Sequence, residues 1–297
     1  MQLRFLDVAT GLPDSGIVVC IGRRKSGKTV NILDILYHKR MSFSHGIVFC
    51  GSKATCREYQ QHIPSVFIHD EFNPKLLESI VNKQERDVEM GTAKPIFVLL
   101  DDLMYAKGAV TRDKTVRRIA FNGRHAKIFL ILSMQYSMDL DPSIRQQIDF
   151  VFLSREKNKH YREKLYNAYN VCFESPSAFD RAMTSCTNDF ETFVLSSASD
   201  TQSDKPEDNA FWFKSKPGRK FKMNAKGSWW KFHRRMYDPK HFLRNDGGDQ
   251  ATVTLVSAPK RAPQISHTEE GKKHIATERL RNVGPRSGIG TGLRDVL

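Results

Sequence analysis

The sequence predicts a three-layer α/β/α fold, with helices on both faces of a mostly parallel β-sheet and a basic extension at the carboxyl end. Two observations predict this fold. Short unbroken runs of Val, Ile, Leu and Phe recur up to about residue 195, and such runs are typical of strands buried on both faces. Between the runs, apolar residues recur every three or four positions, which is typical of helices that pack on a sheet.

The elements alternate along the chain, and each strand is predicted from an apolar run. The predicted strands span residues 17–21, 46–50, 65–68, 96–100, 128–132 and 150–153, followed by an edge strand at 191–195. The predicted helices span residues 30–39, 74–89, 111–122 and 158–170. Because helical segments separate most consecutive strands, we expect the strands to run parallel.

The character of the sequence changes after Ser196. Residues 197–206 have no apolar periodicity and are rich in turn-forming residues, so we expect the core domain to span residues 1–200. The segment at 201–244 is basic and aromatic, and we expect it to pack on the core or to extend it. The tail at 245–297 has few large apolar side chains, which predicts disorder.

The composition excludes several classes of protein. The chain has 297 residues, of which 39% are hydrophobic and 27% charged, so wholesale disorder is excluded. No stretch reaches the roughly 18 to 20 apolar residues of a membrane span, and the first residues lack a signal peptide's apolar region. We therefore expect a soluble, non-secreted protein. The cysteines include no CxxC pair, which argues against a zinc site or disulfide framework and predicts reduced thiols at Cys20, Cys50, Cys56, Cys172 and Cys186.

Positive charge is concentrated near the carboxyl end. Residues 211–297 carry 19 basic against 7 acidic residues, whereas residues 1–210 carry 28 against 26. A clustered positive field attracts a polyanion, for which nucleic acid is the first candidate and an anionic membrane the second. A solvated surface and an acidic protein partner are the alternatives. The residues predicted to contact nucleic acid are Lys214, Lys216, Arg219, Lys220, Lys222, Lys231, Arg234 and Arg235.

A phosphate-binding motif directly follows the first predicted strand and precedes a predicted helix. It matches the P-loop pattern GxxxxGK[ST] at every fixed position, with Gly22, Arg23, Arg24, Lys25, Ser26, Gly27, Lys28 and Thr29. The glycines let backbone N–H groups point at phosphate oxygens, and the helix adds its positive dipole end. The Lys28 ammonium is expected to bind the β- and γ-phosphates of a nucleotide, and the Thr29 hydroxyl to bind Mg²⁺.

Polar residues follow two further predicted strands. Asp101 and Asp102 end the run at 96–100, and Gln135 follows the run at 128–132. Because parallel strands end at the same edge of a sheet, Asp101 is expected to orient Mg²⁺ and its water. Asp102 is expected to act as the general base, and Gln135 to sense the γ-phosphate or the attacking water. The structural alternatives are a loop-capping acid pair and a polar residue that begins a loop.

Two arginines are candidates to stabilise charge in a phosphoryl-transfer transition state. Arg124 lies just before the strand at 128–132, and Arg145 lies in the segment before the strand at 150–153. Either can act within its own subunit or across an interface as an arginine finger. A solvated surface charge is the alternative for both.

Taken together, the motifs resemble those of a known family. They are GRRKSGKT at 22–29, LLDD at 99–102, NGRH at 122–125, SMQY at 133–136 and PSIRQQIDFVFLS at 142–154. This set is similar to the DNA-packaging ATPases of poxviruses and other eukaryotic double-stranded DNA viruses, within the FtsK–HerA motor superfamily. The resemblance covers about residues 5–240.

The resemblance implies a P-loop NTPase fold of the additional-strand class, in which an extra strand lies between the P-loop strand and the metal-binding strand. It implies a ring of five or six subunits that hydrolyses ATP with Mg²⁺ and moves double-stranded DNA into a preformed capsid. The implied partners are DNA, further copies of the chain, and a capsid or portal vertex, within an infected host cell or a virion. By family position Arg124 is the preferred finger, and Arg145 is the second choice.

Three other functions remain open at this point. A DNA-segregation or secretion motor of the same superfamily would use the same ATP chemistry. A virion or regulatory protein could bind DNA and use the nucleotide only as a conformational switch. A small-molecule kinase would need an arginine-rich lid and a compact acceptor pocket, for which the sequence instead supplies Gln135 and a basic tail.

Overall fold

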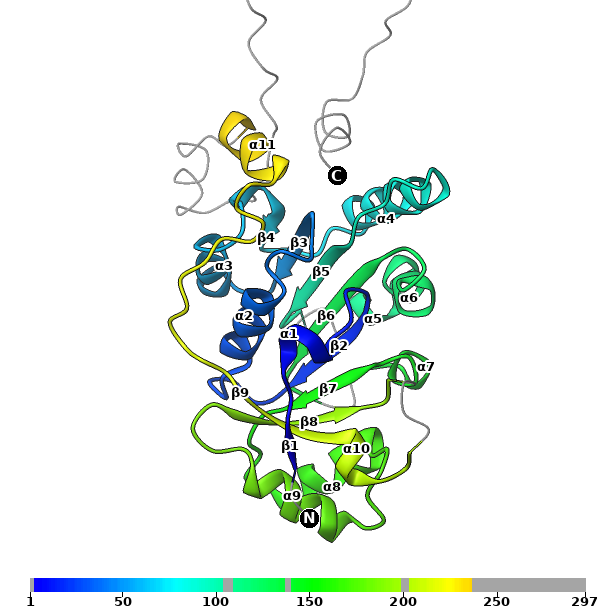
Figure 1. The fold of residues 1–297 in the computed structure, drawn as a ribbon, viewed down its shortest axis with the longest axis vertical. Helices are drawn as coiled ribbons and strands as arrows, with labels where there is room; N and C mark the ends of the chain where they lie inside the picture. The colour runs from blue at the N-terminus through cyan, green and yellow to red at the C-terminus, as the bar shows by residue number, and fades with distance from the viewer. Residues whose placement is uncertain (1–2, 104–108, 137–139, 199–202, 237–297) are drawn as a thin grey trace, which may run out of the picture.

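The computed structural model describes residues 3–103, 109–136, 140–198 and 203–236 (Figure 1), so the tail predicted to be disordered lies outside the described residues. The strands are β1 (Arg4–Phe5), β2 (Gly16–Ile21), β3 (His45–Cys50), β4 (Ile68–His69), β5 (Ile96–Asp101), β6 (Ile128–Met134), β7 (Phe150–Leu153), β8 (Glu191–Ser196) and β9 (Ala210–Lys214). The helices are α1 (Val8–Gly11), α2 (Lys28–His38), α3 (Lys53–Gln60), α4 (Pro74–Glu89), α5 (Ala109–Arg112), α6 (Lys114–Asn122), α7 (Pro142–Arg145), α8 (Lys159–Tyr169), α9 (Pro176–Ser185), α10 (Pro206–Asn209) and α11 (Ser228–Met236).

The strands form one mostly parallel sheet. Among the described residues its order is β1-β9-β8-β7-β2-β6-β5-β3-β4. Strands β7, β2, β6, β5, β3 and β4 are parallel to one another, whereas β8 runs antiparallel to both β7 and β9. The predicted α/β class with a mostly parallel sheet is therefore confirmed.

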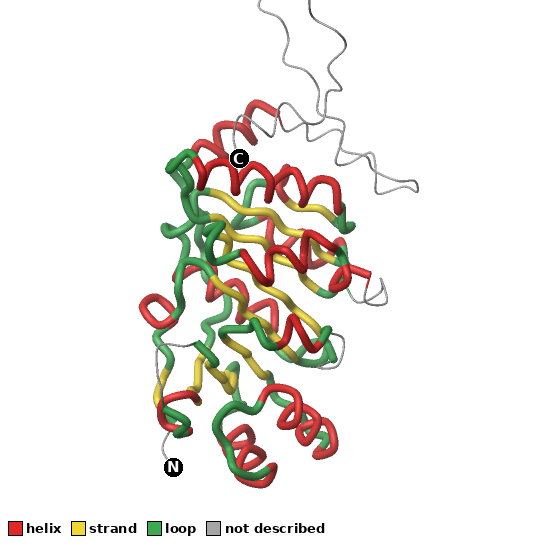
Figure 2. Tube along the Cα trace, turned by 90° about the vertical axis from the view of Figure 1, so that its right-hand side faces the viewer, coloured by secondary structure: helices red, strands yellow, loops and turns green. Residues whose placement is uncertain are grey.

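The centre of the sheet is buried because its strands are apolar on both faces. Every residue of β2, β3, β5 and β6 is buried. Figure 2 shows the strands as a central layer with helices to either side. Within the described part of the chain, no helix is long and apolar enough to cross a membrane.

Local sequence signals fix where several helices begin. Asn73 caps α4, because its side chain accepts a hydrogen bond from the Leu76 N–H and a proline occupies the first turn. Asp113 caps α6 in the same way, accepting from the N–H groups of Thr115 and Val116. Helix α2 instead begins after Gly27, whose φ of 90° lets the backbone turn sharply out of the phosphate-binding motif.

Two predicted strands differ in the structure. The edge strand predicted at 191–195 exists as β8 but lies inside the sheet, because β9 pairs with its other side. Residues 65–67 form a 3₁₀ turn after Pro64, so only Ile68–His69 are left for β4. Proline favours a turn at this point, which a count of apolar residues does not detect.

The prediction that all cysteines are reduced is wrong for one pair. Cys50 and Cys56 form a disulfide with a Cα–Cα distance of 6.1 Å, and the three other thiols are free and buried. Cys50 ends β3, and α3 begins three residues later and turns back, which brings Cys56 beside the strand end. Spacing along the sequence did not reveal this pair because the contact depends on the turn between the two elements.

The segment after β9 returns along the body of the molecule to α11. This crossing segment, residues 215–227, runs past α2 in Figure 1. Its Lys216 N–H donates to Asp34 of α2 over 3.0 Å. Further along, the N–H of Asn224 donates to the Arg40 carbonyl over 2.8 Å, just before β3 begins. The crossing segment therefore connects the carboxyl edge of the sheet, where β9 ends beside the start of β8, with the opposite edge.

Trp229 of α11 is part of the main core. Its side chain is 1% exposed, and its ring centroid lies 5.6 Å from that of Phe67 and 6.4 Å from that of Phe97. We expect Trp229→Ala to lower the free energy of unfolding by about 3 to 5 kcal/mol, because it removes a large buried side chain and leaves a cavity. Urea unfolding followed by circular dichroism measures the change. Lys231→Ala, on the exposed side of the same helix, is the control and should have almost no effect; equal losses in both variants would contradict the core assignment.

Candidate functional site

The phosphate-binding motif forms the loop between β2 and α2. Lys28 is the first residue of α2, and its ammonium donates to the carbonyl oxygens of Gly22 over 2.6 Å and of Arg23 over 3.0 Å. Lys25 and Gly27 both have left-handed backbone conformations, with φ of 63° and 90°. The side chain of Lys28 is buried, and burial lowers its pKa from the usual value. The two hydrogen bonds of Lys28 therefore hold the P-loop in its curled conformation.

The strand order around this loop decides the fold. Strand β6 pairs in parallel with β2 on one side and with β5 on the other. The register between β5 and β6 runs from Ile96–Ile128 to Asp101–Ser133. The loop follows β2, and the acidic pair follows β5, with one strand between them. The fold is that of a P-loop NTPase. The extra strand implied by the family resemblance is β6, so the predicted additional-strand arrangement is present.

Two buried hydroxyl groups lie at the P-loop. The Oγ atoms of Ser26 and Ser154 are buried and have no hydrogen-bond partner among the described residues. Gly22 lies against both, since a Cβ atom built on it would be 2.4 Å from the Ser26 Oγ and 2.7 Å from the Ser154 Cβ. Buried hydroxyls without partners are uncommon in folded proteins, and here they adjoin N–H groups at a helix start. The loop is therefore suited to receive phosphate oxygens.

Asp101 lies at the carboxyl end of β5, close to the P-loop strand. It is 3% exposed, and burial raises the pKa of its carboxyl group above the usual value. The hydroxyl of Tyr59, a fully buried residue of α3, donates to the Asp101 Oδ2 over 2.7 Å. The sequence did not identify Tyr59 as a site residue, because the two residues are 42 positions apart and no motif connects them. Tyr59 fixes the orientation of the carboxylate.

Asp102 and Gln135, which the sequence placed at the same edge, are in direct contact. The Gln135 Nε2 donates to both carboxylate oxygens of Asp102, over 2.8 and 2.9 Å. Asp102 has a φ of 51°, a left-handed conformation that is rare outside glycine. Its N–H donates to the Ser133 carbonyl of β6 over 3.2 Å, which holds this turn in place. Strained backbone of this kind is concentrated at functional sites.

The oxygen groups at this edge fit Mg²⁺ together with a nucleotide. Among the described residues no group of three or more His, Cys, Asp or Glu side chains could hold a metal by itself. Mg²⁺ is usually bound by one or two protein oxygens and by substrate phosphates, so such a group is not required. Asp101 supplies a carboxylate held by Tyr59, and Thr29 is partly exposed in the first turn of α2. These two residues are the candidate protein ligands.

Arg124 and Arg145 do not lie at this edge. Arg124 precedes β6, and its guanidinium pairs with the Oδ1 of Asp149 at the start of β7. The Oδ2 of Asp149 accepts a hydrogen bond from the N–H of Ile17, near the start of β2, over 2.7 Å. Arg145 is the last residue of α7, which precedes the same aspartate, and the N–H of that aspartate donates to the Ile17 carbonyl. Both arginines are thus at the amino edge of the sheet, about 20 Å from the P-loop by strand length. Neither can contact a nucleotide held by its own P-loop.

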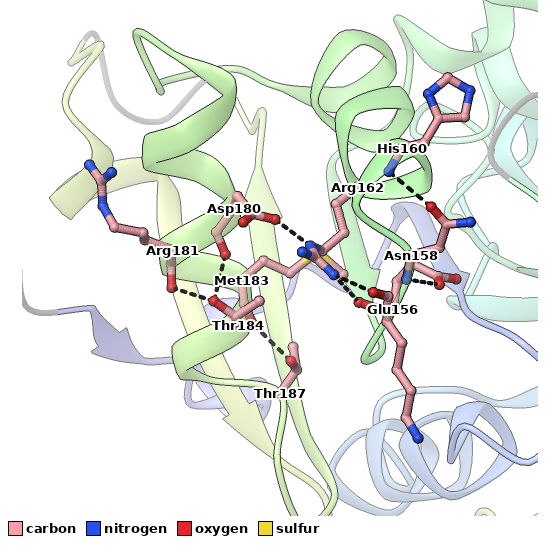
Figure 3. Close-up of polar contacts among 10 residues, drawn as sticks. Glu156, Asn158, His160, Arg162, Asp180, Arg181, Met183, Thr184 and Thr187 are labelled. Atoms are coloured by element: carbon pink, nitrogen blue, oxygen red, sulfur yellow. Dashed lines mark hydrogen bonds and ion pairs between the residues drawn. The ribbon is translucent and has the colours of Figure 1, made fainter.

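Helices α8 and α9 follow β7 along the chain, and Figure 3 shows the polar contacts around this pair. Arg162 of α8 pairs with Asp180 of α9 and donates to the carbonyl oxygens of Glu156 and Lys157 over 2.8 and 2.9 Å. The Glu156 carboxylate in turn binds the Arg23 Nε over 2.9 Å. This network holds the exposed Arg23 side chain against the segment that follows β7.

The residues predicted to bind nucleic acid fall into two groups. Arg219 pairs with the buried Asp34 and lies 4.1 Å over the Tyr37 ring, and Lys214 pairs with Glu191 over 3.3 Å. These two have partners within the chain. Lys214 is nonetheless exposed, as are the other six predicted residues, of which Lys222 and Arg235 lie over the rings of Trp230 and Phe232. These six are Lys216, Lys220, Lys222, Lys231, Arg234 and Arg235. The last three share the exposed side of α11.

Sequence comparisons find relatives in DNA viruses. No protein-family model matches the chain. The chain is 28% identical over 233 residues to protein L437 of Acanthamoeba polyphaga mimivirus, which covers 75% of this chain and 80% of that protein. It is 31% identical over 219 residues to protein 015R of Frog virus 3, which covers 72% of this chain and 66% of that protein.

Solved structures with a similar fold were also found. One is the genome packaging NTPase B204 from Sulfolobus turreted icosahedral virus 2 in complex with ATPγS, with a TM-score of 0.48 and 20% identity over 69% of this chain and 99% of that chain. Another is EssC from Geobacillus thermodenitrificans, with a TM-score of 0.45 and 13% identity over 66% of this chain and 38% of that chain. The sequence relatives come from large DNA viruses, which is the setting that the family resemblance implies.

Proposed function

We propose that the chain is an Mg²⁺-dependent ATPase that moves double-stranded DNA during assembly of a viral particle, acting as a ring of subunits. One observation carries the catalytic part of this proposal. Lys28, Asp101 and the Asp102–Gln135 pair meet at one edge of the sheet, at the ends of three adjacent parallel strands. The sequence relatives in large DNA viruses support the viral setting.

The chain's own residues suggest how hydrolysis proceeds. When ATP enters, the Lys28 ammonium exchanges the carbonyl oxygens of Gly22 and Arg23 for the β- and γ-phosphates. Asp101 and Thr29 would hold Mg²⁺, which compensates phosphate charge when bound. Asp102 accepts a proton from the attacking water, whose oxygen forms the bond to the γ-phosphorus as the bond to ADP breaks. The amide of Gln135 orients Asp102 and the water.

We propose that a neighbouring subunit supplies the arginine finger of each ATP site. Both candidate arginines lie at the edge of the sheet away from their own P-loop, so a finger role requires a second copy of the chain. We propose Arg124 for this role, because about half of its side chain is exposed although it pairs with Asp149. Ring assembly would then complete each ATP site.

Steady-state ATP hydrolysis by the purified chain at low salt, with and without long duplex DNA of arbitrary sequence, tests this proposal. Stimulation by DNA supports a motor that grips phosphates without reading sequence. Turnover that is slow and indifferent to DNA would favour the nucleotide-switched DNA-binding protein instead. A segregation or secretion motor would pass this test, and packaging into purified capsids separates it from the proposed function.

The exposed side of α11 is the surface that we propose contacts DNA phosphates. Replacing Lys231, Arg234 and Arg235 together by Gln should weaken duplex binding and reduce the slope of log affinity against log salt by about three, since each phosphate contact releases about one counterion. Fluorescence anisotropy at several salt concentrations measures both quantities. Replacing three exposed lysines elsewhere, Lys75, Lys94 and Lys157, removes the same charge and is the control. An equal change in the two variants would show that only net charge matters.

A further inference from the structure

An exposed aromatic side chain borders the P-loop and has no role in the mechanism above. Phe190 precedes β8, and its side chain is 49% exposed. Its Cδ1 atom lies 3.8 Å from the position that a Cβ atom on Gly27 would occupy. Because β8 runs antiparallel to β7, the beginning of β8 lies at the same edge of the sheet as the P-loop. Phe190 makes no ring contact with any other aromatic side chain among the described residues.

The backbone at Phe190 has an unfavourable conformation. Asp189 and Phe190 both have positive φ, of 43° and 64°. Such angles are unusual for an aromatic residue and persist only where neighbouring groups enforce them. The Phe190 carbonyl accepts hydrogen bonds from the N–H and the Oγ of the buried Ser215, over 3.1 and 3.2 Å. In addition, Asn31 of α2 donates to Thr192 of β8 over 2.8 Å, which ties α2 to the strand that begins beside Phe190.

The order of the strands gives the direction in which a bound nucleotide must lie. The groups proposed for hydrolysis, Asp101, Asp102 and Gln135, follow β5 and β6, which lie to one side of the P-loop strand β2. The γ-phosphate must face them. The nucleoside therefore leaves the loop on the other side of β2, where β7 and β8 lie. Phe190 is on that side, next to the loop residue that precedes α2.

We propose that the Phe190 ring stacks on the purine base of ATP and determines specificity for a nucleoside triphosphate over the phosphate chain alone. A flat base and an aromatic ring stack favourably in water, and removing such a ring typically weakens binding by roughly tenfold. The proposed contact accounts for a half-exposed ring kept in a strained turn at this position. The inference rests on the proposed function, because it concerns the same P-loop and the same nucleotide.

Equilibrium binding of ATP and of inorganic tripolyphosphate, measured by calorimetry, tests the inference on the full chain. Phe190→Ala should weaken ATP binding by roughly tenfold and leave tripolyphosphate binding unchanged. In steady-state assays it should raise KM for ATP and leave kcat unchanged, because the base takes no part in bond breaking. Phe190→Gly relieves the positive φ and should show the same ATP defect without loss of folding. Phe190→Trp should retain ATP binding.

Each remaining outcome decides against the inference. Equal weakening of ATP and tripolyphosphate would show that the ring only supports the loop. Unchanged ATP binding in the variants would show that the base lies elsewhere. Phe121→Ala, which removes a 46% exposed phenylalanine from α6, is the matched control and should bind both ligands as the unmodified chain does. Failure of the unmodified chain to bind either ATP or tripolyphosphate would overturn the proposed function itself. That result comes from the unmodified chain alone, so it is distinct from any outcome with the Phe190 variants.

Discussion

Lys28→Ala should reduce ATP turnover by about a thousandfold, because it removes the one cation whose position in the P-loop matches the β- and γ-phosphates. In the structure the ammonium is buried and bonded to the carbonyl oxygens of Gly22 and Arg23. Alanine would leave these two carbonyls without a donor and the bound triphosphate without charge compensation. Binding of ATP should weaken as well, since the lysine contacts the ground state and the transition state.

The measurement is phosphate release under saturating ATP, together with ATP binding by calorimetry. Lys75→Ala is a suitable control, because Lys75 is exposed and also lies in the first turn of a helix. It removes the same side chain without touching the P-loop and should leave turnover unchanged. Near-normal turnover in Lys28→Ala would contradict the P-loop assignment and with it the proposed catalytic function.

The sequence was sufficient to predict the central sheet and the meeting of the P-loop with Asp101, Asp102 and Gln135. Buried parallel strands are continuous apolar runs, and each of these candidate residues lies at or just after the end of such a run. Their convergence follows from parallel strand order alone, since all such strands end at one edge. The sequence therefore predicted that Asp102 and Gln135 lie at the same edge of the sheet, but it did not predict the hydrogen bonds between them.

Contacts between elements that are distant in sequence could not be predicted. Tyr59 reaches Asp101 because α3 packs beside the end of β3, and nothing in its local sequence distinguishes it from any other core tyrosine. Phe190 reaches the P-loop only because β8 reverses direction in the sheet. Arg219 was grouped with the exposed cations because sequence shows charge but not the buried Asp34 that pairs with it. In each case tertiary packing, not local pattern, decides the role.

Arg124→Ala should bind ATP nearly normally but lose most of its hydrolysis, about a hundredfold or more, if its guanidinium completes the site of a neighbouring subunit. The structure adds a competing explanation, because Arg124 also pairs with the buried Asp149 at the starts of β2 and β7. Removing one partner of a pair with a buried carboxylate destabilises a fold. A simple loss of activity would thus be ambiguous.

Two comparisons separate the explanations. Asp149→Asn breaks the ion pair and keeps an oxygen that can accept from the Ile17 N–H, so a purely structural role of Arg124 predicts that both variants lose activity together. A finger role predicts that Asp149→Asn retains hydrolysis while Arg124→Ala does not. In mixtures with the unmodified chain, Arg124→Ala should also lower activity by more than its fraction, because each variant subunit disables a neighbour's site. Activity strictly proportional to the unmodified fraction would refute action of Arg124 across the interface, and its pairing with Asp149 would then be its role.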